Sequence, residues 1–338
     1  MKIAISLIVG IILSGGGFFL AFKNVPFSDL KAYLNSVNYF WIIPSSILVV
    51  LTYILRVIRW RIILSGYKSI DFWSAFHPLM IGFMLNYVLP ARIGEIARPI
   101  ILQKEEQVPF STGIATVTIE RLFDSILLIT LLPIILSNVY IDPKLDIAFG
   151  NLHLNKQTLQ TISSAVAKIC AVIISIIALI CINKTRKIII DLTAKLPTKI
   201  SVPVISVIEN FASGLSLFND LKNLYLSMAL SIGIWLIGFL SYYVMIFGCP
   251  GVKVSFIEIS ATVIIICYFI ALPSAPGYWG LWEAGGVFGL ALFGVSQKDA
   301  AGFTLINHFI QIVPIIIIGF VSAIITGAKI WQLSYEKQ

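Results

Sequence analysis

Apolar residues form long uninterrupted runs along this chain, and polar residues gather in shorter stretches between them. Six runs have about the 20 residues that a helix needs to cross the apolar core of a bilayer. They cover residues 3–22, 40–58, 111–136, 162–182, 224–247 and 303–326. The pattern predicts an all-α polytopic membrane protein. The first run is too long for a typical signal peptide, and we expect it to be a retained first span.

Two further apolar segments, residues 72–104 and 255–296, are interrupted near the middle by proline and glycine. Proline removes a backbone donor and disfavours helix at the residue before it, so each segment is expected to break into two short helices. Each pair is either re-entrant or crosses the membrane twice, and the chain then has about eight hydrophobic segments. The residues expected at the breaks are Pro90, Gly94, Pro99, Pro273, Pro276, Gly277 and Gly280.

Lysine and arginine in the loops predict the orientation, because cytoplasmic loops carry an excess of them. The stretch after the second run, with Arg56, Arg59, Arg61 and Lys68, is expected to be cytoplasmic. Loop 183–223 is also basic and is expected to hold an amphipathic helix, for example around residues 201–218. Loop 137–161 has no positive excess and is expected outside. Both termini are then cytoplasmic.

The two halves of the chain follow the same order of elements. Residues 1–150 and residues 151–338 each hold two spans, one broken segment and one span, and the loop charges give the halves opposite orientations. We therefore predict an inverted-topology repeat. Paired interrupted segments at matching positions of such halves indicate a transport site near the bilayer midplane. Non-helical backbone at that depth must be buried in protein or line a wet cavity.

Composition agrees with a membrane protein and excludes several other classes. The chain of 338 residues is 58% hydrophobic and only 12% charged, whereas a soluble domain is about 25% charged. The net charge of +8 is confined to a few loops, which favours contact with anionic lipid over nucleic acid. The four cysteines have no metal-ligand spacing, and no catalytic or nucleotide-binding motif is present. We expect no metal, no cofactor and no enzymatic activity.

The first broken segment carries Arg92, Glu95 and Arg98 at spacings of three. On a helix these residues share about one face, and Pro99 is expected to end or kink that helix. The planar guanidinium of arginine binds phosphate through two hydrogen bonds. We expect Arg92 or Arg98 to hold a lipid phosphate, with Glu95 as the partner when the site is empty. An internal salt-bridge cluster is the alternative.

The run at 111–136 contains Glu120, Arg121 and Asp124. Arg121 and Asp124 can pair along one face, whereas Glu120 and Asp124 repel unless a cation or proton lies between them. Arg98 is a candidate cation for Glu120. The three residues either serve the substrate or lie at the membrane interface.

The second broken segment carries Glu283 beside Tyr278, Trp279 and Trp282. Its aromatic residues form an interfacial belt or line a path for acyl chains. Glu283 is expected to face protein, because a carboxylate among acyl chains is very costly. The last span has a polar stripe, which either joins helices or lines a cavity. The stripe consists of Asn307, His308 and Gln311.

These motifs resemble one known family. LPARIGEIARPIIL, TIERLFDSILL, LPSAPGYWGLWEAG and HFIQIVPIIIIG resemble, in order, the signatures of the flippase-like, lysylphosphatidylglycerol synthase transmembrane family. The resemblance implies an inner-membrane protein that moves a polar-headed lipid between leaflets, here without the soluble aminoacyl-transferase domain of the best-known members. The positions that match the family motifs are Arg92, Glu95, Arg98, Glu120, Arg121, Asp124 and Glu283.

The sequence therefore predicts a lipid translocase of the bacterial inner membrane. Its partners are expected to be membrane phospholipids or polyprenyl-phosphate-linked lipids, and not nucleic acid. Three alternatives stay open: an intramembrane lipid-linked glycosyl- or acyl-transferase, an exporter of a small solute, and an accessory partner of a glycosyltransferase. A homodimer also stays open.

Overall fold

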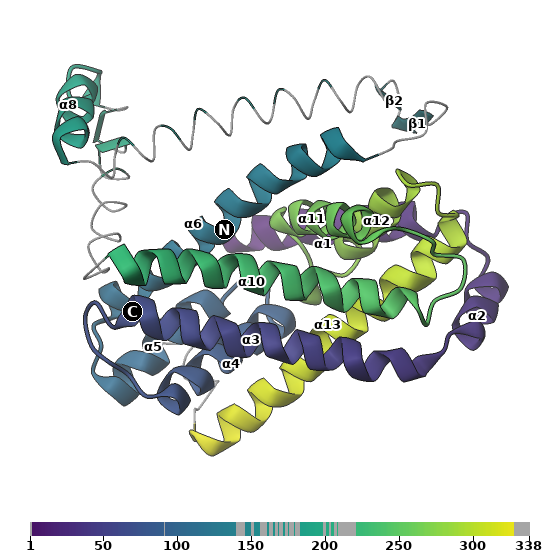
Figure 1. Cartoon of the computed structure of the whole chain (residues 1–338), viewed down its shortest axis with the longest axis horizontal. Helices are drawn as coiled ribbons and strands as arrows, with labels where there is room; N and C mark the ends of the chain where they lie inside the picture. The colour runs from purple at the N-terminus through teal and green to yellow at the C-terminus, as the bar shows by residue number, and fades with distance from the viewer. Residues whose placement is uncertain are drawn as a thin grey trace.

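The computed structural model describes residues 2–90, 92–139, 146–149, 152–155, 183–198 and 221–327, with isolated positions at 161–179 and 201–208. Most of the described residues are helical, which confirms the predicted all-α class (Figure 1). The long helices are α1 (Lys2–Phe22), α3 (Ile42–Leu64), α6 (Phe110–Asn138), α10 (Leu221–Ile246) and α13 (Gln297–Ile325). The shorter ones are α2 (Phe27–Ser36), α4 (Phe72–Val88), α5 (Gly94–Glu106), α8 (Asn183–Thr193), α11 (Phe256–Ala271) and α12 (Leu281–Ala291).

Two strands interrupt the helical pattern. They are β1 (Asp146–Phe149) and β2 (Leu152–Asn155), which pair antiparallel as a small hairpin within the loop 137–161. The predicted span at 162–182 and the amphipathic helix around 201–218 fall largely outside the described residues. Within loop 183–223, the described helix is α8.

Three described helices are long and apolar enough to cross a membrane: Tyr39–Leu64, Leu221–Ile246 and Gln297–Ile325. The first joins the 3-10 turn η1 (Tyr39–Trp41) to α3. The consecutive pair α1 and α2 would be a fourth span, although the two helices are bent by 76°. Helix α6 has 29 residues and matches the predicted run at 111–136. Figure 1 shows α3 and α10 side by side along much of their length.

Both broken segments form helical hairpins, as the proline and glycine pattern predicts. Helices α4 and α5 pack on each other, and so do α11 and α12. These four helices have 17, 13, 16 and 11 residues, which is fewer than the roughly 20 needed to cross a bilayer core. The chain is extended at Leu89 and at Leu272, each directly before a proline. Pro99 lies inside α5 and does not end it.

Glycine allows the helices within each hairpin to touch. A Cβ atom on Gly94 would lie 1.7 Å from the carbonyl oxygen of Gly82 on α4. In the second hairpin, a Cβ atom on Gly289 would lie 2.9 Å from the Thr262 side chain on α11. The two helices of each hairpin therefore pack closely against each other, and this packing fixes the position of the break between them.

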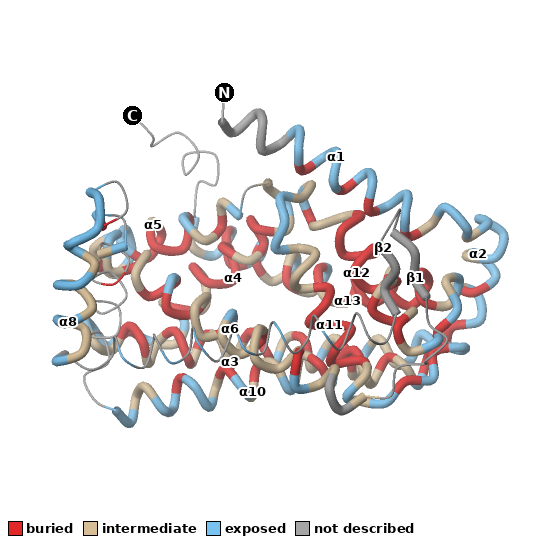
Figure 2. Tube along the Cα trace, turned by 90° about the horizontal axis from the view of Figure 1, so that it is seen from above, coloured by how far each residue is buried: buried red, intermediate tan, exposed pale blue. Residues whose placement is uncertain are grey.

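The two breaks meet inside the molecule. The ring of Tyr87, at the end of α4, packs edge-on against the ring of Tyr278 at 5.9 Å. Tyr278 belongs to the 3-10 turn η2 (Pro276–Tyr278) in the second break. From the first break, Arg92 donates from Nη2 to the carbonyl oxygen of Ile270 at 3.1 Å. Figure 2 shows that buried residues gather along α4, α12 and α13, whereas α1, α2 and α8 are largely exposed.

Arg56 and Arg59 do not lie in a loop, contrary to the sequence prediction. Helix α3 continues to Leu64 and places both residues on its inner side, where Arg59 is fully buried. The apolar residues after Arg59, including Trp60 and Ile63, are buried as well. The helix therefore continues past the end of the predicted run, and two of its arginines belong to the interior.

The approach of α4 and α5 makes Gly94 the most sensitive glycine of the first hairpin. Alanine normally stabilises a helix relative to glycine by about 0.5–1 kcal/mol. Gly94→Ala is expected to do the opposite and cost about 2 kcal/mol or more, because the new methyl group overlaps backbone. Thermal unfolding in detergent, followed by size-exclusion chromatography, measures the change.

Gly233→Ala in α10 is the matched control, since a Cβ atom there meets nothing within 4 Å. It should melt at or above the wild-type temperature. Equal stability of the Gly94 and Gly233 variants would contradict the close packing of α4 on α5.

Candidate functional site

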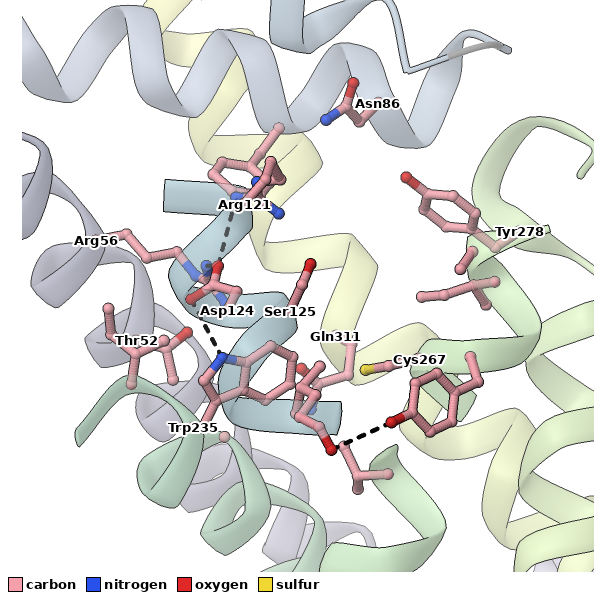
Figure 3. A pocket seen from close by; sticks show the side chains of 18 of the residues that line it. Thr52, Arg56, Asn86, Arg121, Asp124, Ser125, Trp235, Cys267, Tyr278 and Gln311 are labelled. Atoms are coloured by element: carbon pink, nitrogen blue, oxygen red, sulfur yellow. Dashed lines mark hydrogen bonds and ion pairs between the residues drawn. The ribbon is translucent and has the colours of Figure 1, made fainter. Parts of the chain in front are cut away.

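A cavity of about 410 Å³ opens where the two hairpin breaks face each other (Figure 3). Residues of both breaks and of α3, α6, α10 and α13 line it. Its charged lining residues are Arg56, Arg92, Glu95, Arg121 and Asp124. Its uncharged polar and aromatic lining includes Thr52, Tyr53, Asn86, Tyr87, Ser125, Trp235, Tyr242, Tyr268, Tyr278, Trp282 and Gln311.

Asp124 of α6 is the centre of the charged network beside this cavity. Arg59 donates from Nη1 to its Oδ1 at 2.6 Å, and Arg56 donates from Nη1 to its Oδ2 at 3.2 Å. The indole of Trp235 on α10 donates to Oδ1 at 3.3 Å, and Arg121 lies 3.8 Å from Oδ2. Four side chains on three helices thus direct hydrogen-bond donors at this one carboxylate.

Glu120, one turn earlier on α6, is held by two arginines. Its Oε1 lies 3.4 Å from Nη2 of Arg59, and its Oε2 lies 2.9 Å from Nη2 of Arg98. The guanidinium of Arg98 also packs over the ring of Trp60, with its carbon 4.1 Å from the ring centroid. Glu120 and Arg98 are buried and do not line the cavity. Their ion pair joins α5 to α6, and the cavity is lined by the other charged residues named above.

The charges around the cavity do not cancel. Five arginines, Arg56, Arg59, Arg92, Arg98 and Arg121, stand against the three carboxylates Glu95, Glu120 and Asp124. Among the described residues of this network, the formal surplus is two positive charges. Glu95 is only loosely paired, at 3.9 Å from Nε of Arg121.

Arg92 is the most available of these arginines. It is exposed, and its hydrogen bond to the Ile270 carbonyl joins the first break to the end of α11. Its backbone is left-handed, with φ of 52°, a conformation that costs energy for a residue with a side chain. Strained backbone of this kind often marks binding sites. Arg92 thus stands at the mouth of the cavity with donors directed across the junction of the hairpins.

A second buried pair lies behind the other break. His308 of α13 contacts Oε1 of Glu283 through Nδ1 at 2.5 Å, and it donates from Nε2 to the Gly277 carbonyl at 2.8 Å. Because a carbonyl only accepts, Nε2 carries a proton, and one more proton lies between Nδ1 and Glu283. Glu283 also accepts from the Gly280 amide at 2.7 Å. Both side chains are completely buried.

Two tryptophans enclose this pair. The ring of Trp282 stacks on His308 with centroids 4.4 Å apart and planes 8° apart, and Trp279 lies on it at the same distance. Trp282 is buried and also lines the cavity, so it does not belong to an interfacial belt. In the described part of the chain, no group of three or more His, Cys, Asp or Glu side chains is placed to hold a metal.

With this geometry in view, comparison with known proteins decides the family. The family model for the lysylphosphatidylglycerol synthase TM region matches residues 7–319. The chain belongs to this family. The match covers the cavity, both hairpins and the His308–Glu283 pair, so the described site is part of the family's membrane region.

Curated relatives agree with this assignment. The chain is similar to UPF0104 membrane protein MJ1595 of Methanocaldococcus jannaschii, with 24% identity over 89% of each chain. It is also similar to UPF0104 membrane protein MJ1078 of the same organism, with 26% identity over 70% of this chain and 91% of the relative. Glycosyltransferase AglD of Haloferax volcanii is 22% identical over 91% of this chain, which spans about half (52%) of that protein. This family member is thus a multi-pass membrane protein.

The structure divides the predicted site residues into two groups. Those that line the cavity are Arg92, Glu95, Arg121, Asp124 and Gln311. Those that lie behind it are Arg98, Glu120, Glu283, Asn307 and His308. The pairing of Arg98 with Glu120 is confirmed, as is that of Arg121 with Asp124. The predicted common face is wrong for Arg92, because α5 begins only at Gly94 and the backbone of Arg92 is left-handed. Glu95 and Arg98 lie three residues apart on α5, and both approach residues of α6.

Sequence reasoning missed two central residues of the family member's network, Arg56 and Arg59. Their spacing of three on a continuing apolar helix was the available signal. It also missed four of the tyrosines that line the cavity, Tyr53, Tyr87, Tyr242 and Tyr268, because tyrosines in apolar runs are common and nothing in their spacing distinguished these.

Removing the Arg59 guanidinium should destabilise the protein more than removing its neighbour. Arg59→Met leaves Glu120 and Asp124 buried with fewer partners, and a broken buried pair costs about 3–5 kcal/mol. Arg56→Met leaves Asp124 bound to Arg59 and should cost about 1.5–3 kcal/mol, the value of one hydrogen bond between charged groups. Denaturant unfolding in detergent compares the two; equal losses would show that Arg59 is not the organising residue.

His308 and Glu283 should be strongly coupled energetically. A double-mutant cycle with His308→Leu and Glu283→Leu is expected to give a coupling of about 1–3 kcal/mol, because either single change leaves a buried polar partner. The exposed pair Lys68 and Glu106 is the reference, and its coupling should stay within about 1 kcal/mol. Strictly additive losses at 283 and 308 would contradict the pairing.

Proposed function

We propose that this protein is a lipid translocase that holds a polar lipid head group in the cavity between its two hairpin breaks. The observation that carries the proposal is the placement of three arginines, Arg56, Arg92 and Arg121, on the wall of that cavity. A positive, partly enclosed cavity in an otherwise apolar membrane protein attracts an anionic group. The lipid tails would remain in the membrane.

Phosphate is the anionic group that fits these arginines best. A guanidinium binds phosphate through two parallel hydrogen bonds, and such charge-assisted bonds are about twice as strong as neutral ones. Arg92 would exchange the Ile270 carbonyl for the phosphate, because its present partner is a single neutral acceptor. Glu95, at 3.9 Å from Arg121, would yield Arg121 to the ligand in the same way.

The packing of the helices supports the proposed inverted repeat. Helix α4 packs on α13, and its counterpart α11 packs on α6. Likewise α5 packs on α6 and α12 packs on α13, while α3 and α10 pack on each other. Each of these contacts thus has a counterpart under exchange of the halves, as a two-fold relation requires.

Residue positions support the same relation. Arg121 and His308 each follow the first residue of their helix, Phe110 or Gln297, by eleven positions. Three residues later, Asp124 and Gln311 both line the cavity. Arg121 approaches Glu95 of α5, and His308 binds Glu283 of α12.

Such repeats allow alternating access, in which one half moves against the other around a shared site. We place both termini on the cytoplasmic side and the protein in the cytoplasmic membrane. The two hairpins would be re-entrant, since their helices are too short to span.

A second candidate is a role beside or within a lipid-linked glycosyl transfer reaction. The similarity to Glycosyltransferase AglD supports it, because it extends over 91% of this chain. In this reading the protein is an intramembrane transferase or recruits one. We favour a protein that is not itself an enzyme, because Asp124, a candidate base, is occupied by arginines.

Reconstitution in vesicles tests translocation. Purified protein should accelerate exchange of a fluorescent phosphatidic acid between leaflets, measured by chemical quenching from outside. Arg92→Ala and Arg121→Ala should each slow this exchange at least tenfold, since one charge-assisted hydrogen bond contributes about 1.5–3 kcal/mol.

Lys253→Ala, an exposed cation outside the cavity, is the control and should exchange lipid like the wild type. No exchange by the wild type, or full exchange by both arginine variants, would overturn the proposal. Transfer of a labelled sugar onto lipid in detergent would favour the second candidate instead.

A further inference from the structure

The cavity is chemically different at its two ends. Arg56, Arg121 and Asp124 lie together on one side in Figure 3, and Gln311 and Cys267 lie on the other. Figure 3 labels no charged side chain beside Gln311 and Cys267, and Tyr268 and Tyr242 line the same cavity. The two ends therefore call for different chemical groups on one ligand.

Two helices give the distance between these ends. The Tyr268 hydroxyl donates to the carbonyl of Leu128, which lies seven residues beyond Arg121 on α6. The Gln311 amide donates to the Ser241 hydroxyl, six residues beyond Trp235 on α10. At 1.5 Å per residue the two separations are about 10.5 Å and about 9 Å along the helix axes.

The neutral end suits hydroxyl groups. Hydroxyls donate and accept, and so do the tyrosine hydroxyls and the Gln311 amide, whereas guanidinium only donates and carboxylate only accepts. Aromatic side chains supply flat apolar surface with a polar edge, which suits a ring carrying hydroxyls. Tyr268 reaches across from α11, and Trp282 adds ring surface to the lining.

The size of the cavity limits what can follow the phosphate. At about 410 Å³ it lies near the lower end of the roughly 300–1,000 Å³ typical of small-molecule sites. One six-membered ring attached to a phosphate spans the distance between the ends, whereas a longer glycan would exceed the space. A cationic amine would meet the arginine surplus at one end and no carboxylate at the other.

From these observations we infer that the head group is a phosphate ester carrying one hydroxyl-rich ring, with the phosphate at Arg56 and Arg121 and the ring at Tyr242, Tyr268 and Gln311. This inference rests on the proposed function and makes it more specific. The matching positions Asp124 and Gln311 would then lie at opposite ends of the ligand, with Asp124 holding the arginines that bind the phosphate.

Binding of defined lipids tests the inference. The probes are phosphatidic acid, which has phosphate alone, phosphatidylinositol, which adds a hydroxyl-rich ring, and a monoglucosyl diacylglycerol, which has a ring without phosphate. Soluble glucose 1-phosphate separates a lipid from a free solute. Dissociation constants are measured in detergent by native mass spectrometry. We expect phosphatidylinositol to bind at least tenfold more tightly than either of the other lipids.

Two variants at the neutral end provide the second measurement. Gln311→Leu and Tyr268→Phe each remove polar groups from the ring end and should lower the preference for phosphatidylinositol over phosphatidic acid toward one. Arg121→Gln should weaken both phospholipids, and Lys253→Ala should leave the preference unchanged. The preference is a ratio of two dissociation constants measured on folded protein, so a partial loss of folded protein does not change it. A second variant keeps the test valid if one of the two does not fold.

The outcomes are distinguishable. Equal affinity for phosphatidylinositol and phosphatidic acid, or a preference that survives both neutral-end variants, would overturn the inference while leaving phosphate-lipid transport intact. If glucose 1-phosphate binds as tightly as phosphatidylinositol, the head-group chemistry is supported but the lipid translocase is not. If none of the four probes binds, both proposals fail.

Discussion

The complete burial of the Arg59 guanidinium is the constraint on which the rest of the site depends. A charge removed from water is very costly unless partners surround it, and lipid offers none. Arg59 of α3 obtains its partners from Asp124 and Glu120 on α6 and from the Ser231 hydroxyl on α10. These helices must therefore pack together at this level, and the carboxylates they present are then fixed beside the cavity.

The same constraint explains why some arginines remain available to a ligand. Arg59 and Arg98 satisfy the two buried carboxylates, so Arg56 and Arg121 act on Asp124 only from its exposed side. Arg92 has a carbonyl for its partner. The buried carboxylates are thus already paired with buried arginines. The further arginines can therefore present positive charge to the cavity without leaving any of these carboxylates unpaired.

Much of the fold can be predicted from the sequence, because the local pattern of residues determines where each of these helices begins and ends. The apolar runs at 111–136, 224–247 and 303–326 become α6, α10 and α13. Proline after leucine at Leu89 and Leu272 breaks the two shorter segments, as local backbone sterics require. Even one long-range pair, Arg98 with Glu120, is predictable, since a lone carboxylate in an apolar helix needs a cation.

The site itself needed contacts that no single segment encodes. Arg56 and Arg59 stand near the end of an apolar run, where arginines usually mark a loop, and only the partners on α6 reveal that they are interior. Gly277 and His308 are 31 residues apart, and their hydrogen bond depends on how α13 packs behind the second break. Distance along the chain hides such pairs from pattern reasoning, which works within one element at a time.

The two hairpins pack alike, but the side chains that their glutamates contact differ. The Glu95 hairpin faces Arg121, an arginine on the cavity wall, whereas the Glu283 hairpin is tied to His308 in a closed pair behind tryptophan. Two chemically identical halves would line both ends of the cavity alike and would suit a ligand with two like ends. Under the proposed repeat, a head group that differs from end to end would require one half to supply charge and the other to supply neutral polar groups, and Asp124 and Gln311 at the matched positions would provide that difference.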